Sequence, residues 1–281
     1  MTSPDTRSLV RESRKNNRFY QQAVAGEIPG VTIVHKFGRN TAVGTNFVPV
    51  AIGGVYPTPQ SGAATPIRVK AGDAKDTAAG SGARQIAVIG VDASGASLSA
   101  NLATNGGAAG AESSASFMRV FRAYVSQSGS YATATQGSHE QPIVVESSAL
   151  GDMCTIDGSA GSFPRGQSEI GVYTIPAGHK GYILEGEVFT DTSKITNLLL
   201  FQREGITETA APYSAMRVVL EERLEGGEST LPFQAPVGPF QGPCDIGWMA
   251  KVNTGTAEVD VDFEILVISD DTNLFQPTSG S

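Results

Sequence analysis

The sequence predicts an all-β fold, with one or two antiparallel β-sandwich domains of jelly-roll type and an N-terminal helical or extended arm. Short apolar or alternating runs recur along the chain, separated by turns of Gly, Ser, Asp or Pro. Gly and Pro are abundant, at 33 and 15 of 281 residues, whereas charged residues make up only 17%. Helix-like features are confined to the N-terminal segment. These observations favour strands and turns over helices.

Residues 1–40 are predicted to form a docking arm. Ser3, Pro4 and Asp5 suit the start of a helix, and the following residues allow this helix to continue to Ala25. Its middle is polar, so the helix buries little surface alone, and we expect it to become ordered on a partner. The residues expected to make contact are Arg7, Arg11, Arg14, Lys15, Arg18, Phe19, Tyr20, His35, Lys36 and Arg39.

The charge of the chain is distributed unevenly. Residues 1–40 carry seven basic and three acidic side chains, a net charge of +4, while the whole chain carries −8, so the remainder carries −12. A basic leader on an acidic body favours docking on an acidic protein surface. Nucleic-acid contact is the weaker alternative, because no recognised binding motif is present and the acidic body would repel phosphates.

Residues 41–156 are predicted to form the first sandwich domain. The runs at 85–92 and 97–104 are joined by a short polar loop in which Gly95 can adopt a positive φ, a pattern typical of a hairpin. The run at 117–125 alternates, but neither of its faces is purely apolar. We therefore expect this strand to lie between a core and a subunit contact.

A second sandwich is predicted at residues 167–270, after the Gly/Ser-rich break "DGSAGSFPRG" at 157–166. One large sandwich with a long crossing loop is the alternative. Within this region, Pro176 and Gly178 suit a tight reversal between strands. Residues 271–281 are read as a polar tail.

The clearest predicted strand is Ala257–Ile268. One of its faces is apolar and the other is an acidic stripe, made of Glu258, Asp260, Asp262 and Glu264. The stripe lacks the glycine and loop of an EF-hand calcium site. We therefore predict that it is solvated or faces another subunit.

No catalytic, cofactor or metal site is predicted. Gly80 and Gly82 precede a strand, whereas the glycines of a nucleotide-binding loop follow a strand and open a helix. The histidines, His35, His139 and His179, belong to no signature of nucleophilic catalysis. Paired carboxylates that cleave polysaccharide stay an open alternative, because their spacing is a tertiary property.

Cys154 and Cys244 form no metal-binding or redox motif, so we predict two buried free thiols. The N-terminus has no apolar core of a secretory signal, and no run approaches the length of a membrane span. We expect a soluble protein that is made in the cytoplasm.

Several segments together resemble a known family. They are, in order, "VHKFGRN", "IRVKAGDAKDTAAGSGARQIAVIGVDASG", "SFMRVFRAYV", "GQSEIGVYTIPAGHKGYILEGEVF" and "VDVDFEILVI". They resemble virion structural proteins of tailed bacteriophages, a group frequent among marine phages. The resemblance covers about residues 30–268 and is most specific at "DTAAGSGAR" and "YTIPAGHKGYI".

This resemblance implies a structural subunit without catalytic activity, which decorates the capsid or belongs to the neck, tail or fibre. It also implies other virion proteins as partners, a symmetric homo-oligomer and no cofactor. A tail protein that binds host glycans through Tyr131, Tyr213, Phe240 or Trp248 is the alternative. A depolymerase is the third and weakest hypothesis.

Overall fold

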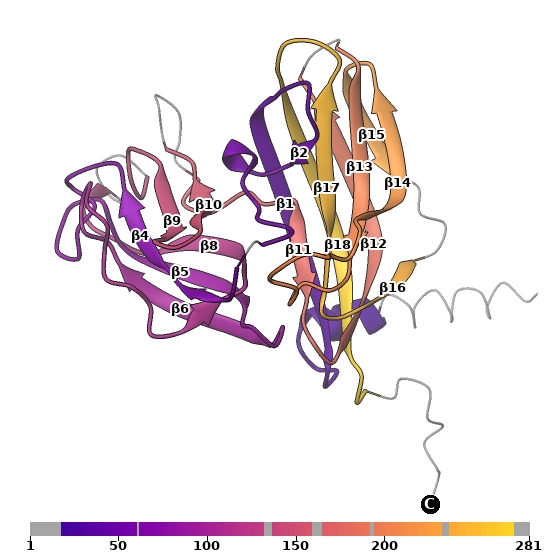
Figure 1. Cartoon of the computed structure of the whole chain (residues 1–281), viewed down its shortest axis with the longest axis horizontal. Coiled ribbons are helices and arrows are strands. Elements are labelled where there is room, and N and C mark those ends of the chain that lie inside the picture. Colours follow the sequence, from indigo (N-terminus) through magenta and orange to yellow (C-terminus); the bar gives the residue numbers. More distant parts are fainter. Residues whose placement is uncertain are drawn as a thin grey trace, which may run out of the picture.

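The computed structural model describes residues 18–60, 62–131, 137–158, 165–191, 194–231 and 236–272. Within these ranges most of the regular structure is β-strand, and the strands form several antiparallel sheets. The prediction of an all-β fold is therefore confirmed. The strands are arranged in a larger and a smaller lobe (Figure 1).

The larger lobe contains β1 (Val31–Val43), β2 (Val48–Pro49), β11 (Val172–Ile175), β12 (His179–Thr190), β13 (Thr196–Arg203), β14 (Arg217–Leu224), β15 (Gly227–Leu231), β16 (Val237–Gln241), β17 (Cys244–Val252) and β18 (Ala257–Ser269). The smaller lobe contains β3 (Thr65–Pro66), β4 (Arg68–Ala71), β5 (Ala83–Val91), β6 (Ser97–Ala103), β7 (Ser116–Phe117), β8 (Arg119–Ser128), β9 (Ile143–Ser147) and β10 (Gly151–Ile156). A short 3-10 helix, η1 (Ile52–Gly54), follows β2.

The larger lobe is built from two five-stranded sheets. In the first sheet, β1, β18, β12 and β15 lie in that order, and β16 also pairs with β12. In the second sheet, β11, β17, β13 and β14 lie in order, and β2 also pairs with β17. Their buried side chains share one core, which includes Val261 and Phe263 from the first sheet and Leu200 and Trp248 from the second.

The smaller lobe is inserted between β2 and β11, and both of these strands pair with β17. Pro49 lies opposite Met249, and Val172 lies opposite Gly247. The chain thus leaves the second sheet after β2, forms β3 to β10, and returns to the same partner strand.

The lobes divide the chain differently from the predicted domains. β1 crosses the boundary expected between residues 40 and 41, because it pairs with β18 on both sides of it, at Asn40 and at Val43. Residues 31–40 are therefore part of a sheet and not of an arm. β2 also joins strands from the predicted second domain, 167–270. Hydrophobic periodicity indicates a strand but does not identify its partner, so sequence reasoning missed both pairings.

Three local predictions are confirmed. β5 and β6 form a hairpin in which Gly95 has a φ of 80°. Gly178, with a φ of 72°, lies in the reversal between β11 and β12. Cys154 and Cys244 are free and buried.

Only the end of the predicted N-terminal helix falls within the described residues, as a helical stretch at 18–24. Ala23 is buried with Val31 and Leu266, and Phe19 and Ile28 pack against this cluster. The stretch therefore covers an apolar part of the first sheet. The earlier part of the helix, residues 1–17, and residues 273–281 of the polar tail lie outside the described ranges.

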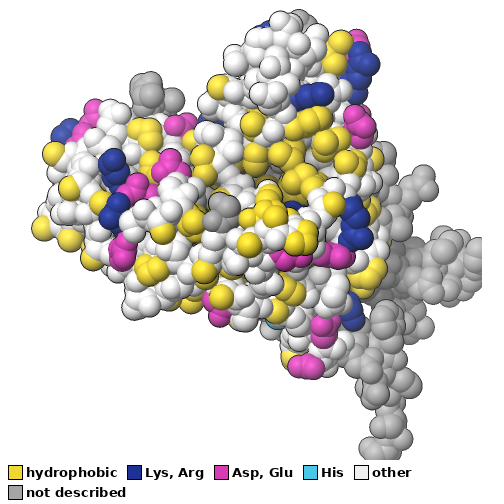
Figure 2. All heavy atoms as spheres, in the orientation of Figure 1, with side chains coloured by type: hydrophobic (Ala, Val, Ile, Leu, Met, Phe, Trp, Pro, Cys, Tyr) yellow, Lys and Arg dark blue, Asp and Glu magenta, His cyan; other side chains and the backbone are white. Residues whose placement is uncertain are grey.

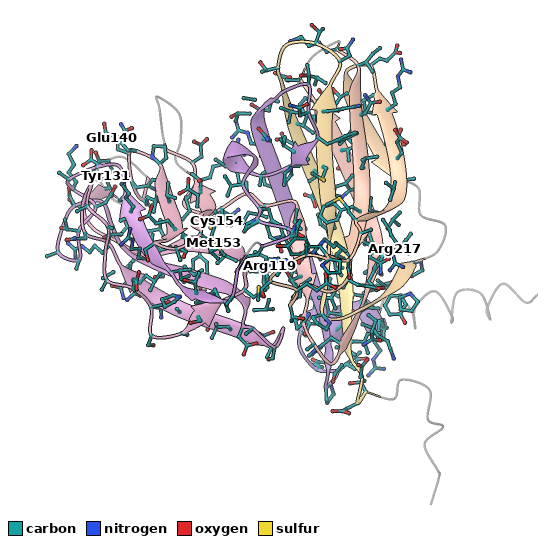
Figure 3. The ribbon with its side chains drawn as sticks, in the orientation of Figure 1. Arg119, Tyr131, Glu140, Met153, Cys154 and Arg217 are labelled. Atoms are coloured by element: carbon teal, nitrogen blue, oxygen red, sulfur yellow. The ribbon has the colours of Figure 1, made fainter. Side chains whose placement is uncertain are left out.

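A buried ion pair joins the two lobes. Arg119 on β8 donates from Nε to Oδ2 of Asp245 on β17 over 3.0 Å, and both side chains are completely buried. The hydroxyl of Thr174 donates to the other carboxylate oxygen, as does that of Tyr56. Arg119 lies at the junction in Figure 3. β8, the strand that was expected to lie between a core and a subunit contact, reaches this junction between the lobes through Arg119.

Candidate interaction surface

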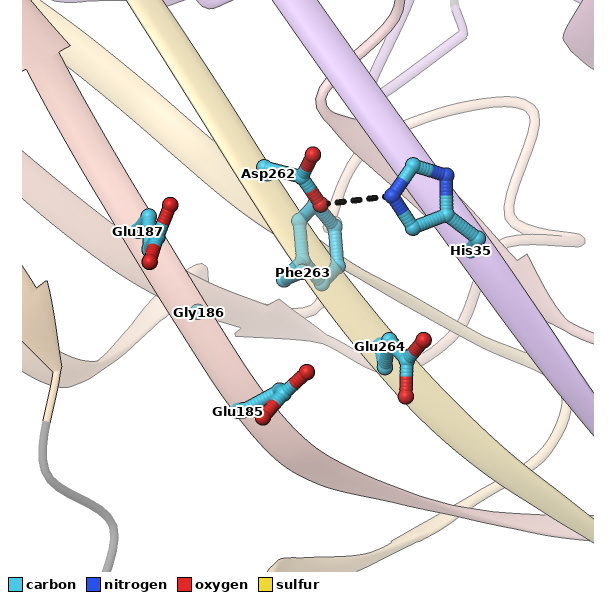
Figure 4. A pocket seen from close by; sticks show the side chains of 7 residues that line it. All are labelled: His35, Glu185, Gly186, Glu187, Asp262, Phe263 and Glu264. Carbon is cyan, nitrogen blue, oxygen red and sulfur yellow. Dashed lines mark ion pairs between the residues drawn. The ribbon is translucent and has the colours of Figure 1, made fainter. Parts of the chain in front are cut away.

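Four carboxylates and a histidine lie together on the outer side of the first sheet. Glu185 and Glu187 come from β12, Asp262 and Glu264 from β18, and His35 from β1 (Figure 4). The strands place them there because side chains alternate between the two faces of a sheet. Val261 and Phe263 point into the core, so their neighbours Asp262 and Glu264 point outward. We call the four carboxylates the acidic face.

The pairing of the strands brings like charges together. Glu264 lies opposite Glu185, and Asp262 lies opposite Glu187. Directly opposite side chains stand roughly 5 Å apart at Cβ, where like charges repel. His35 relieves part of this repulsion, because its Nε2 lies 2.7 Å from Oδ1 of Asp262. The five side chains line a shallow hollow of about 240 Å³.

This arrangement favours a basic partner. The hollow is lined by a single basic side chain, that of His35. Among the residues that the structure describes, no three His, Cys, Asp or Glu side chains are arranged to hold a metal ion. Excess negative charge on an open sheet face is suited to attract a cationic protein segment.

The rest of the acidic stripe is neutralised by arginines. Arg39 pairs with Glu258 at 3.0 Å and lies 3.9 Å from Asp260. Burial, followed by the charge of Glu258, raises the pKa of Asp260 to about 6. Arg165 pairs with the buried Glu169 at 2.7 Å on the same side of β1. Within the acidic face, Asp262 is paired with His35, and Glu264 is the one member of the stripe without an ion pair among the described residues.

The structure separates the residues that were predicted as docking contacts. Arg7, Arg11, Arg14 and Lys15 lie outside the described ranges. Arg18, Phe19 and Tyr20 belong to the helical stretch, where Phe19 packs on the first sheet and Tyr20 is 40% exposed. His35 lies beside the acidic face, and Arg39 is held by acidic partners.

Lys36 is buried instead of exposed. Its Nζ donates to the carbonyl oxygen of Phe121 on β8 over 2.6 Å. Burial, followed by the nearby positive charge of Arg122, lowers the pKa of Lys36 to about 7. Sequence reasoning missed the role of Arg122, because nothing local in the chain indicates that β8 lies against β1.

The other histidines have structural surroundings. His139 is fully buried, and its two ring nitrogens lie 2.7 Å from the hydroxyl of Ser138 and from the carbonyl oxygen of Asp157. Burial lowers the pKa of His139. Nδ1 of His179 lies 3.0 Å from the carbonyl oxygen of Ala177.

The aromatic residues considered for glycan stacking do not form one platform. Trp248 and Phe240 are buried, with exposed fractions of 1% and 3%. Tyr213 lies beneath the guanidinium of Arg203. Tyr131 lies on the smaller lobe, where it donates to Glu140 (Figure 3).

Apolar side chains are also exposed on the larger lobe. Figure 2 shows hydrophobic side chains gathered on the visible face of the larger lobe, beside its junction with the smaller lobe. Val218 on β14 is 57% exposed, and Phe189, opposite Asp260 on the outer side of the first sheet, is 40% exposed. Exposed apolar side chains that gather in patches are frequent in protein contacts.

In the described part of the chain, no helix has the length and apolar character needed to cross a membrane. Comparison with family models, curated proteins and solved structures finds no match for this chain.

Proposed function

We propose that this chain is a non-enzymatic structural subunit of a tailed-phage virion and that its larger lobe is a jelly roll. The observation that carries the proposal is the nested pairing of the strands: β1 with β18, β2 and β11 with β17, β12 with β15 and β16, and β13 with β14. A long hairpin rolled into two sheets has this connectivity, and viral capsid domains use it. The family-like segments of the sequence support the same reading.

The docking element of this proposal is the basic segment before the helical stretch. Residues 1–17 carry four basic and two acidic side chains, a net charge of +2, and Arg18 follows directly. The helical stretch at 18–24 packs on the first sheet, whose outer side also carries the acidic face. A basic segment and an acidic face on one subunit suit a repeated contact between neighbouring subunits.

Particle reconstitution tests the docking element. Full-length protein and a variant that lacks residues 1–17 are mixed with particles depleted of this subunit, and bound protein is measured after gradient purification. We expect the deletion to reduce incorporation strongly and a fourfold substitution of Arg7, Arg11, Arg14 and Lys15 by Gln to do the same. The deletion keeps Phe19 and Ala23, which cover the sheet, so the fold is preserved.

A matched control removes basic charge elsewhere. Arg217 and Arg223 are both more than half exposed on β14, and their replacement by Gln should leave incorporation unchanged. Undiminished incorporation of the deletion variant would contradict the docking claim.

Static light scattering of the isolated protein tests the proposed homo-oligomer. A monomer at all protein concentrations would contradict it.

A further inference from the structure

We propose that the free edge of β1 binds an extended, carboxylate-bearing segment of another protein as an added β-strand. This inference goes beyond the proposed virion role and does not depend on it. β1 is the end strand of the first sheet and pairs there only with β18, among the strands that the structure describes. Its other edge faces the smaller lobe (Figure 1).

The backbone groups on this edge can be assigned from the strand register. In an antiparallel ladder, successive residues alternate between bonding to one neighbour and to the other side. The N–H of Arg39 donates away from β18, to the carbonyl oxygen of Glu169. Ile33, His35 and Phe37 share this direction, because the register is regular from Val31 to Asn40.

These three residues have no backbone partner on this side within the described ranges. The nearby segment that could have covered them turns away: Ser168 donates to Ala123, and Val125 donates to Gly166, so residues 166–168 follow β8. β1 and this segment therefore meet at Arg39 and Glu169 and diverge from there.

The divergence leaves a groove of about 530 Å³ along the edge. Residues 32–37 form one wall, and Arg122, Gln167 and Ser168 contribute to the rest. A six-residue stretch of strand spans roughly 20 Å, which is long enough for the alternating bonds of an added strand. Addition of a strand to an open edge is a recurring mode of peptide recognition.

The basic side chains of the groove favour an acidic occupant. All titratable side chains in its lining are basic: His35, Lys36 and Arg122. Arg122 forms no ion pair with any described residue, and its guanidinium carbon lies 5.6 Å from the centre of the Tyr124 ring. Lys36 is 7% exposed, and its ammonium group has one hydrogen-bond acceptor, the carbonyl oxygen of Phe121. A carboxylate placed between these two side chains would give Arg122 a counter-charge and would favour the protonated form of Lys36.

The same charges argue against a second copy of β1 as the occupant. Antiparallel pairing of two such edges would bring two sets of Lys36 and Arg122 together, at a cost in repulsion. The occupant is therefore an extended segment of another protein, and one of its acidic side chains points toward Lys36.

Binding of defined peptides to the full-length protein tests the proposal. The probe is fluorescein-labelled Thr-Val-Glu-Val-Thr-Val, capped at both ends, and its binding is followed by fluorescence anisotropy at low ionic strength. Two matched probes replace Glu by Lys or carry N-methyl groups at alternate backbone positions. We expect the Glu peptide to bind at least about tenfold more tightly than either control, since charge and backbone bonding both contribute.

Protein variants and hydrogen exchange locate the site. Arg122→Glu should weaken binding of the Glu peptide about tenfold, whereas Arg223→Glu, an exposed charge change on β14, should leave it unchanged. Ile33→Pro removes an edge N–H that makes no bond to β18 and should also weaken binding. The bound peptide should slow amide exchange at Ile33, His35 and Phe37.

Three results would each overturn the proposal: absence of binding by the Glu peptide, equal binding of the Glu and Lys peptides, or unchanged exchange at the three edge amides. A variant that no longer enters particles but still binds the Glu peptide would show that particle docking and peptide binding use different parts of the protein.

Discussion

At the scale of single residues, Arg119 and Asp245 have the largest expected effect on stability. Both charges are fully buried between the lobes, and Nη2 of Arg119 has no hydrogen-bond acceptor among the described residues. Loss of one partner would leave the other charge buried and unpaired. This ion pair therefore couples the two lobes more strongly than surface pairs do.

We predict that Asp245→Asn lowers the free energy of unfolding by about 3–5 kcal/mol, because the guanidinium of Arg119 loses its counter-charge. Urea denaturation measures this change. The control is Glu204→Gln, which removes the exposed pair with Arg217 and should cost less than about 1 kcal/mol. Equal costs for the two variants would show that the buried pair does not couple the lobes.

The burial of Lys36 should make the free energy of unfolding depend on pH. Its folded pKa of about 7 lies below the ordinary value of 10.5. Between these values the unfolded chain holds the proton and the folded chain does not, so stability rises with pH across this window. Well below pH 7 both the folded and the unfolded chain hold the proton, so stability stops changing with pH and includes the full cost of burying a charged lysine.

We expect the stability of the natural chain to rise by about 2 kcal/mol between pH 7 and pH 9, relative to Lys36→Met. The two proteins share their other titrating groups, so the difference between their unfolding curves isolates Lys36. Parallel pH dependence of the natural chain and the variant would contradict the burial of this ammonium group.

At the scale of secondary-structure elements, Gly38 allows β1 to approach its neighbours closely. A Cβ at this position would meet backbone atoms of Gly171 and the carbonyl oxygen of Val50. Backbone atoms cannot rotate away as a side chain does. This close approach depends on a pairing between distant segments, and the sequence around Gly38 does not indicate it.

We predict that Gly38→Ala destabilises the protein by about 3 kcal/mol, the upper end of the usual range for overpacking. Gly44, just beyond the end of β1, has no heavy atom within 4 Å of an added Cβ. Gly44→Ala should therefore change stability by less than about 0.5 kcal/mol. Thermal unfolding of both variants tests the difference, and equal stability would contradict the close packing at Gly38.

The acidic face predicts that removal of one negative charge stabilises the first sheet. Glu185→Gln ends the repulsion between Glu185 and Glu264 and should raise the free energy of unfolding by up to about 1 kcal/mol at low salt. The gain should shrink at high salt, because ions screen the repulsion. Glu221→Gln is the control, since Glu221 lies opposite Leu199. A destabilising effect of Glu185→Gln would contradict the proposed excess of negative charge.

At the scale of the whole molecule, the sequence predicted local structure better than connectivity. Alternation in Ala257–Ile268 and the turn at Gly95 depend on neighbours in the chain, and both predictions are confirmed. The pairing of β1 with β18 joins residues near the two ends of the sequence, such as Val31 and Ile268. No local period encodes such a partner, so the insertion of the smaller lobe between β2 and β11 was not predicted.

The candidate surfaces could be predicted only in part, again because no local pattern encodes the partner of a strand. The alternation of the acidic stripe is visible in one strand, whereas Glu185 and Glu187 join it only through the pairing of β12 with β18. The basic groove beside β1 needs Arg122 from the inserted lobe. Surfaces that form within one element can be predicted from the sequence, and surfaces that form between elements need the fold.

The most direct test of the central claim is the location of this chain in purified phage particles. Gradient-purified particles from the source of the gene would be imaged by electron cryomicroscopy, and their proteins identified by mass spectrometry. The proposed function predicts that the chain is present in a fixed copy number and that symmetric density fits the two lobes. Absence of the chain from intact particles, with its recovery only in the soluble lysate, would contradict the account.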